Sequence, residues 1–84
     1  MKYKVMCEIT FPSFETTIDV TLPINKTVGY TCSMLDKYII DNLDATYKIK
    51  PNSILVNKKT GTVYDKNKLI AETDIKNGCS LVFY

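Results

Sequence analysis

The sequence has 84 residues, of which 45% are apolar and 24% charged, and its formal net charge is +2. This length and composition predict one globular domain, residues 1–84, and argue against a disordered chain. All eleven basic side chains are lysines, whereas nucleic-acid-binding proteins commonly carry a dense basic patch with arginine. We therefore expect no nucleic-acid partner and interpret Lys48/Lys50 and Lys58/Lys59 as solvated loop and hairpin residues.

The sequence also lacks the usual signals for membranes and export. No stretch approaches the ~20 apolar residues of a membrane span. The N-terminal segment "MKYKVMCEITF" alternates apolar and polar residues, whereas a signal peptide has a continuous apolar run and a cleavage site. We expect a cytoplasmic protein without membrane insertion.

Three cysteines, Cys7, Cys32 and Cys79, occur without a Cys-x-x-Cys spacing and without any histidine. Zinc and iron–sulfur sites need closely spaced Cys or His ligands, so we expect no metal and no cofactor. An odd number of cysteines in a chain without an export signal favours reduced thiols. We interpret all three as small, buried core residues.

The first two predicted elements form a β-hairpin. Residues 3–11 alternate, and the residues predicted to face inward are Tyr3, Val5, Cys7, Ile9 and Phe11. The segment "PSFE" has the composition of a turn. Residues 16–22 then alternate again, with Ile18, Val20 and Leu22 inward, until Pro23 ends the strand.

After Pro23 the apolar period becomes helical. The apolar stripe consists of Val28, Cys32, Leu35, Ile39 and Leu43. Thr27 is the predicted N-cap, and Gly29 weakens the first turn. We expect the helix to end between Leu43 and Thr46, with Asp36, Lys37 and Asp41 on its solvent side.

The remainder of the chain predicts short strands joined by polar segments. "YKIKPN" is a loop, residues 53–56 ("SILV") form a third strand, and "KTGT" turns the chain at Gly61. Residues 63–65 ("VYD") form a short fourth strand, followed by a polar segment with Leu69 and Ile75 as apolar anchors. Gly78 redirects the chain into the last strand, "CSLVFY".

This order, β-β-α-β-β-β, predicts an α+β fold of the β-grasp type. A mixed sheet of four to five strands packs on one amphipathic helix, because the helix has one sheet on which to bury its apolar stripe. In this arrangement the last strand lies beside the first, near the middle of the sheet.

Three stretches carry a resemblance to a known family. They are "TV" at the start of the helix, "SILVNKKTG", and "VYDKNKLIAETDIKNGCSLVFY". Through them the chain resembles ubiquitin-like proteins over nearly its whole length. Within that family it is most similar to the YukD/EsaB group, small cytosolic partners of bacterial type VII (WXG-type) secretion systems. The resemblance implies a protein partner, possibly the cytosolic part of a secretion machine.

Ubiquitin and the sulfur carriers react through a flexible tail that ends in Gly-Gly. The given sequence has no glycine after Gly78 and reaches Tyr84 within or just beyond a predicted strand. We therefore expect a non-conjugating module. The alternative is a modifier or sulfur carrier whose native chain extends beyond Tyr84 to a Gly-Gly tail.

The candidate partner-binding site lies on the outer face of the sheet. If Ile54 and Val56 face the helix, alternation places a different set of residues outside: Met6, Leu55, Val82 and Tyr84. Two interpretations stay open, a docking patch or scattered apolar residues partly covered by lysine side chains.

We expect no catalytic residues. Without histidine, a cysteine or serine nucleophile lacks its usual base. The carboxylate pairs Asp41/Asp44 and Glu72/Asp74 are explained by solvation on the helix surface and in a loop. The sequence therefore favours an interaction module over an enzyme.

Overall fold

The computed structural model describes residues 3–84. Within this range the chain forms four strands, β1 (Lys4–Phe11), β2 (Thr16–Pro23), β3 (Leu55–Asn57) and β4 (Ser80–Phe83). The helix α1 (Val28–Tyr38) continues directly into a π-helical turn over Ile39–Leu43. Short 3-10 turns occupy Pro12–Phe14 and Ile70–Glu72.

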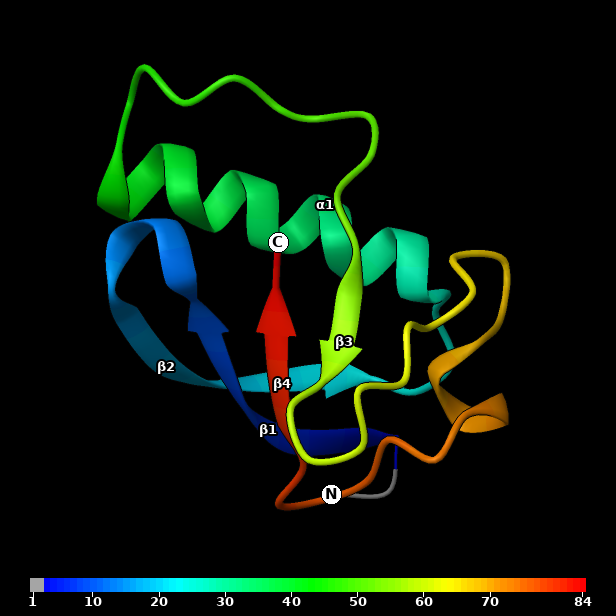
Figure 1. Ribbon diagram of the computed structural model, residues 1–84. Helices are drawn as coiled ribbons and strands as arrows, with labels where there is room; N and C mark the ends of the chain where they lie inside the picture. Colours follow the sequence, from blue (N-terminus) through cyan, green and yellow to red (C-terminus); the bar gives the residue numbers. More distant parts are fainter. Residues whose placement is uncertain (1–2) are drawn as a thin grey trace.

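The sheet has the strand order β2-β1-β4-β3, and α1 lies across one of its faces (Figure 1). β1 pairs with β2 and β3 pairs with β4 in antiparallel fashion, whereas β1 and β4 are parallel. The expected mixed sheet on one helix is therefore confirmed, and so is the position of the last strand beside the first. Residues 44–54 run alongside α1 (Figure 1), where Tyr47 contacts Asp36 of the helix and Phe14 at the turn between β1 and β2.

The start of α1 has the predicted cap and a close backbone contact. Thr27 Oγ1 accepts a 3.0 Å hydrogen bond from the Tyr30 backbone N–H, which satisfies one of the unpaired donors of the first turn. The backbone N–H of Gly29 donates to the carbonyl of Lys66, and a Cβ atom at position 29 would lie 3.1 Å from that oxygen. Gly29 thus lets the segment after Tyr64 approach the helix.

The core fills the space between α1 and the inner face of the sheet. Its central aromatic ring, Phe11, stacks on Tyr38 at 5.7 Å and meets the edge of Phe83 at 6.1 Å. Offset and edge-on aromatic pairs add stability beyond the apolar area they bury. The buried residues of the inner face and helix include Cys7, Ile9, Phe11, Leu22, Val28, Cys32, Leu35, Ile39, Leu55, Leu81 and Phe83. Tyr3, which alternation also placed inward, is exposed.

The register predicted for the third strand is wrong by one residue. Leu55 pairs with Phe83 and is 0% exposed, whereas Ile54 and Val56 are only partly buried. Because Ile54, Leu55 and Val56 are all apolar, the alternation of apolar and polar residues could not decide which of them face the helix. A shift of one residue exchanges the two faces of a strand. Leu55 therefore belongs to the core and not to the outer face.

Three smaller predictions also need correction. The expected strand over residues 63–65 is reduced to a single bridge between Val63 and Val56. In the following segment Leu69, predicted as an apolar anchor, is 37% exposed, and the neighbouring Ile70 is buried instead. The other predicted anchor, Ile75, is buried. Asp36, expected at the solvent side of the helix, is 4% exposed because Tyr47 from the adjacent loop donates a 3.0 Å hydrogen bond to its Oδ1.

Candidate interaction surface

The outer face of the sheet carries a cluster of valines at the junction of β4 and β3. Val82 pairs with Thr10 on one side and with Val56 on the other, and Val56 also bridges to Val63. Val63 is 57% exposed, whereas Val82, between the two neighbouring strands, is only 8% exposed. We call Val56, Val63 and Val82 the valine cluster. It has a buried centre and an exposed edge, the arrangement typical of a small docking patch.

Tyr84 extends the valine cluster toward one end of the sheet. Its backbone N–H donates a 3.0 Å hydrogen bond to the carbonyl of Ile54, which continues the β3–β4 ladder by one residue. Its side chain is exposed. Strand alternation places Tyr84 and Ile54 on the same face as Val82 and Val56.

Of the four predicted partner-binding residues, Val82 and Tyr84 lie together on the outer face. Met6 is exposed on β1, four residues from Thr10, which corresponds to ~13 Å along the strand. It lies beside Gly78, whose N–H donates to its carbonyl, and outside the valine cluster. Leu55 is on the opposite face. The alternation of β4 correctly placed Val82 on the outer face, whereas the exposure of Val63 was not predicted because Val63 was assigned to a strand.

A second feature is a hollow with a volume of about 560 Å³ at the end of the sheet where β3 finishes and β4 begins. We call it the lysine hollow, because Lys58, Lys59 and Lys76 line it together with one carboxylate, Asp74. The Lys58 N–H donates to the carbonyl of Ser80, which fixes the turn after β3 against the start of β4. Positive charge therefore exceeds negative charge around the hollow.

A buried polar chain holds the two walls of the lysine hollow together. The amide of Asn57 donates a 3.0 Å hydrogen bond to the Tyr64 hydroxyl, which donates in turn to Asp74 Oδ1. Burial, reinforced by the hydrogen bond to the Asp74 carboxylate, raises the pKa of Tyr64 to about 12. Asn57 Oδ1 accepts from the backbone N–H groups of Lys59 and Thr60, so the same residue shapes the turn.

The cysteines do not all share one environment. Cys7 and Cys32 are buried, as expected, and burial raises the pKa of both thiols, that of Cys7 to about 11. Cys79 is only partly buried and lines the lysine hollow, which corrects the expectation of three core cysteines.

The carboxylate pairs weighed as catalytic candidates make local bonds. Asp41 forms an i,i+4 ion pair with Lys37 at 3.2 Å, and Asp44 accepts hydrogen bonds from the N–H and hydroxyl of Thr46. Glu72 accepts from the Leu69 N–H. Across residues 3–84, no three His, Cys, Asp or Glu side chains converge as metal ligands would.

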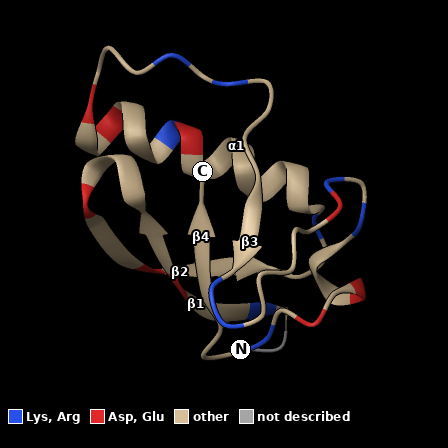
Figure 2. Cartoon of the chain, in the orientation of Figure 1, with Lys and Arg blue, Asp and Glu red and all other residues tan. Residues whose placement is uncertain are grey.

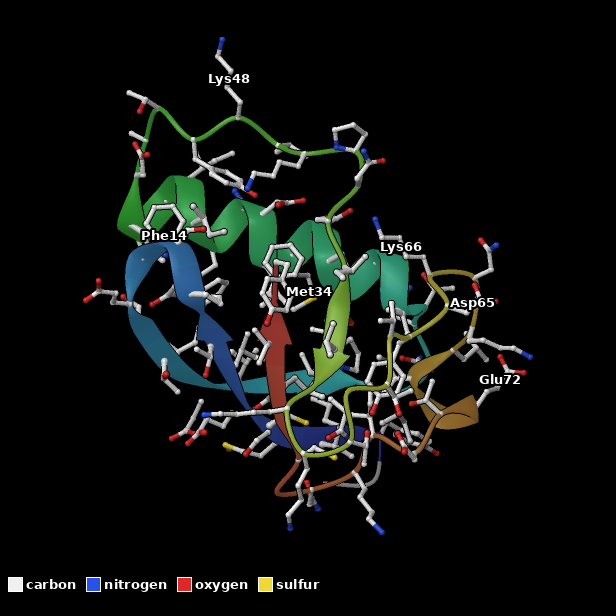
Figure 3. All side chains as sticks on the ribbon, viewed as in Figure 1. Phe14, Met34, Lys48, Asp65, Lys66 and Glu72 are labelled. Carbon is white, nitrogen blue, oxygen red and sulfur yellow. The ribbon has the colours of Figure 1, made fainter. Side chains whose placement is uncertain are left out.

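The lysines occur in separate parts of the surface (Figure 2). Lys48 and Lys50 belong to the loop beside α1 that leads into β3, and Lys48 projects away from the body of the molecule (Figure 3). Lys58 and Lys59 follow the other end of β3. Lys66 lies next to the start of α1 (Figure 3). Among the described elements, no helix is long and apolar enough to cross a membrane.

Solved structures of ubiquitin-like proteins share this fold. Ubiquitin from Caldiarchaeum subterraneum superposes with a TM-score of 0.68 at 16% identity, over 95% of this chain and 90% of that one. The ubiquitin-like domain of an Arabidopsis thaliana protein gives a TM-score of 0.69 at 18% identity, over 96% of this chain and 76% of that one. The chain therefore has a ubiquitin-like β-grasp fold.

A third similar structure is a chain of the ESX-5 inner membrane complex, in its MycP5-free form. The TM-score is 0.71 at 15% identity, and the match covers 98% of this chain but only 21% of that longer chain. No family model and no curated protein matches the sequence. Because one fold hosts many functions, these likenesses define the fold and leave the function to the surface features described above.

Proposed function

We propose that the chain is a non-conjugating ubiquitin-like interaction module, which acts as a cytosolic accessory or regulatory component of a bacterial type VII secretion system. The observation that carries the proposal is the valine cluster with Tyr84 beside it. Among the described residues, α1 covers one face of the sheet and leaves these side chains on the other. An apolar patch with an exposed edge is a suitable anchor for a protein partner.

The secretion assignment rests on two supports. The segment from Val63 to Tyr84 resembles the YukD/EsaB group, and the same fold occurs inside a longer chain of the ESX-5 inner membrane complex. A module of this size and fold is therefore compatible with a role beside membrane-bound secretion components. The binding role is favoured over catalysis because the candidate carboxylates take part in local bonds and the sequence has no histidine.

The alternative is a modifier or sulfur carrier whose chain continues past Tyr84 to a Gly-Gly end. Such a protein would react with an adenylating enzyme and ATP at its terminal carboxylate. Mass spectrometry of the native gene product, followed by incubation with an adenylating enzyme, distinguishes the two. An adenylate or thioester on the native product would overturn the non-conjugating role.

The binding test compares two exposed apolar residues in different places. Val63 is 57% exposed at the edge of the valine cluster, and Ile49 is 61% exposed on the loop beside α1. Titration calorimetry would measure binding to purified soluble domains of type VII components encoded beside this gene. Val63→Ala combined with Tyr84→Ala should weaken binding by about 1–2 kcal/mol or more, whereas Ile49→Ala should not.

The two parts of the proposal fail in different ways. If no secretion component binds the wild-type protein, the secretion assignment is wrong. If a component binds equally well to the wild type and to the Val63/Tyr84 variant, the valine cluster is not the contact surface.

A further inference from the structure

The lysine hollow brings a partly exposed thiol and an excess of positive charge together. Its volume of about 560 Å³ lies within the usual range of small-molecule sites. Cys79 lines it beside Lys58, Lys59 and Lys76. In the described part of the chain none of these three lysines makes an ion pair, and the Oδ1 atom of Asp74 already accepts the Tyr64 hydroxyl. The hollow therefore attracts anions.

A second cysteine lies next to Cys79 on the neighbouring strand. The Glu8 N–H donates to the carbonyl of Cys79, and the Gly78 N–H donates to the carbonyl of Met6, each at 2.9 Å. These bonds hold Cys7 beside Cys79 along the β1–β4 pairing. Neighbouring strands lie about 4.7–4.9 Å apart, which is within the Cα separation that a disulfide allows.

Both sulfur atoms reach the same backbone segment. Cys7 Sγ lies 3.7 Å from the carbonyl oxygen of Lys76, and Cys79 Sγ lies 3.4 Å from the Lys76 nitrogen. The third cysteine, Cys32, is on α1 and packs in the core. By its position, Cys7 is therefore the cysteine that can form a disulfide with Cys79.

We propose that Cys79 and Cys7 form a thiol–disulfide exchange site whose reactants are small anionic disulfides, glutathione disulfide being the representative. The Cys79 thiolate attacks one sulfur of that disulfide, forms a mixed disulfide and expels one glutathione thiolate. The Cys7 thiolate then attacks the Cys79 sulfur and expels the second. The two cysteine sulfurs lose two electrons, the reactant disulfide gains them, and the two thiol protons pass to the released thiolates.

The order of the two steps follows from access. Cys79 lines the hollow, whereas Cys7 is 1% exposed and is not among the lining residues. Burial also raises the pKa of Cys7 to about 11, so its thiolate is scarce near neutral pH and the second step is the slower one. This inference concerns the lysine hollow and does not depend on the partner proposed for the valine cluster.

The test uses three disulfides of similar chemistry and different charge. Cys32→Ser protein is incubated with glutathione disulfide (anionic), 2-hydroxyethyl disulfide (neutral) or cystamine (cationic), and intact mass is followed with time. We expect glutathione disulfide to react fastest, first giving a single glutathionyl adduct and then a protein lighter by two hydrogen atoms. Peptide mapping should find Cys7 linked to Cys79, and mapping of the wild type gives the same information without any substitution.

A charge-matched pair of variants isolates the hollow. Lys59→Gln with Lys76→Gln should slow the reaction with glutathione disulfide about tenfold and leave that with 2-hydroxyethyl disulfide unchanged. Lys48→Gln with Lys50→Gln removes the same charge from the loop beside α1 and should change neither rate. Equal rates for the three disulfides would overturn the anion site, and a mixed disulfide that Cys7 never displaces would overturn the cysteine pair.

Discussion

The Tyr64 hydroxyl donates a 2.6 Å hydrogen bond to Asp74 Oδ1, and this bond joins the segment after β3 to the segment before β4. The hydroxyl also accepts from the buried amide of Asn57. Tyr64→Phe removes both bonds and leaves that amide without its partner, so we expect the free energy of unfolding to fall by about 1–3 kcal/mol. Urea denaturation measures the loss. The control is Tyr3→Phe at an exposed tyrosine, which should leave the free energy of unfolding unchanged.

Tyr64 should also be visible in an alkaline titration. Its pKa is raised from 10.0 to about 12, so its contribution to stability is complete below pH 10 and disappears as the pH rises through about 12. In an absorbance titration of the folded protein, Tyr64→Phe should remove one tyrosine ionisation, the one that occurs near pH 12. If the lost change instead occurs near pH 10, the buried hydrogen bond to Asp74 is absent in solution.

Asp36→Asn should not destabilise the protein at neutral pH. Burial raises the pKa of Asp36, while the hydrogen bond from Tyr47 and the charge of Lys66 oppose the shift. A raised carboxyl pKa means that stability is complete below the unfolded value of 3.8 and is lost as the pH rises through the folded value. Asparagine keeps an acceptor for Tyr47 without the charge.

Urea denaturation of the wild type and of Asp36→Asn at acidic and at neutral pH tests this direction of the pH dependence of stability. The variant should equal or exceed the wild type at neutral pH, and this difference should shrink in acid. A variant that is weaker by more than about 1 kcal/mol at neutral pH would show that the buried charge stabilises the fold.

Substitutions in β3 distinguish its two faces. Leu55 is in the core, so Leu55→Ala should lower the free energy of unfolding by about 2–5 kcal/mol. Val56→Ala truncates a partly buried side chain of the outer face and should lower the free energy of unfolding by clearly less. Equal losses in thermal or chemical unfolding would contradict the observed register.

Thr31 offers a stabilising substitution. Its side chain is buried, and its Oγ1 has no hydrogen-bond partner among residues 3–84. Thr31→Val keeps the shape and removes the unpaired hydroxyl, so we expect a gain of about 1 kcal/mol. Thr31→Ser retains the hydroxyl and loses a methyl group, and should lower stability. A destabilised Thr31→Val protein would indicate that the hydroxyl is hydrogen-bonded in solution.

The sequence predicted the elements that have clear apolar periods. Alternation in β1 and the helical stripe from Val28 to Ile39 each placed the core side chains correctly. Alternation failed at Leu55, because three consecutive apolar residues fit either register, and the choice depends on pairing with Phe83 far along the chain.

Long-range contacts also explain the features that sequence reasoning missed. Asp36 is buried by Tyr47, which belongs to a loop whose path beside α1 leaves no local signal. The partial exposure of Cys79 and its position beside Cys7 depend on how the last turn meets β1. For the candidate surface, the alternation of the last strand placed Val82 and Tyr84 on the outer face of the sheet, as the structure has them, and their role in binding stays a prediction.

The parallel pairing of β1 with β4 has a consequence for how the protein is made. Glu8 pairs with Ser80, so β1 leaves the ribosome well before β4, the strand that pairs with its second edge. The hairpin and α1 form from local contacts, but the sheet closes only after nearly the whole domain has been translated. Nascent chains stalled before β4 should therefore expose the free edge of β1, and these unfinished chains are the form most prone to aggregate or to engage a chaperone.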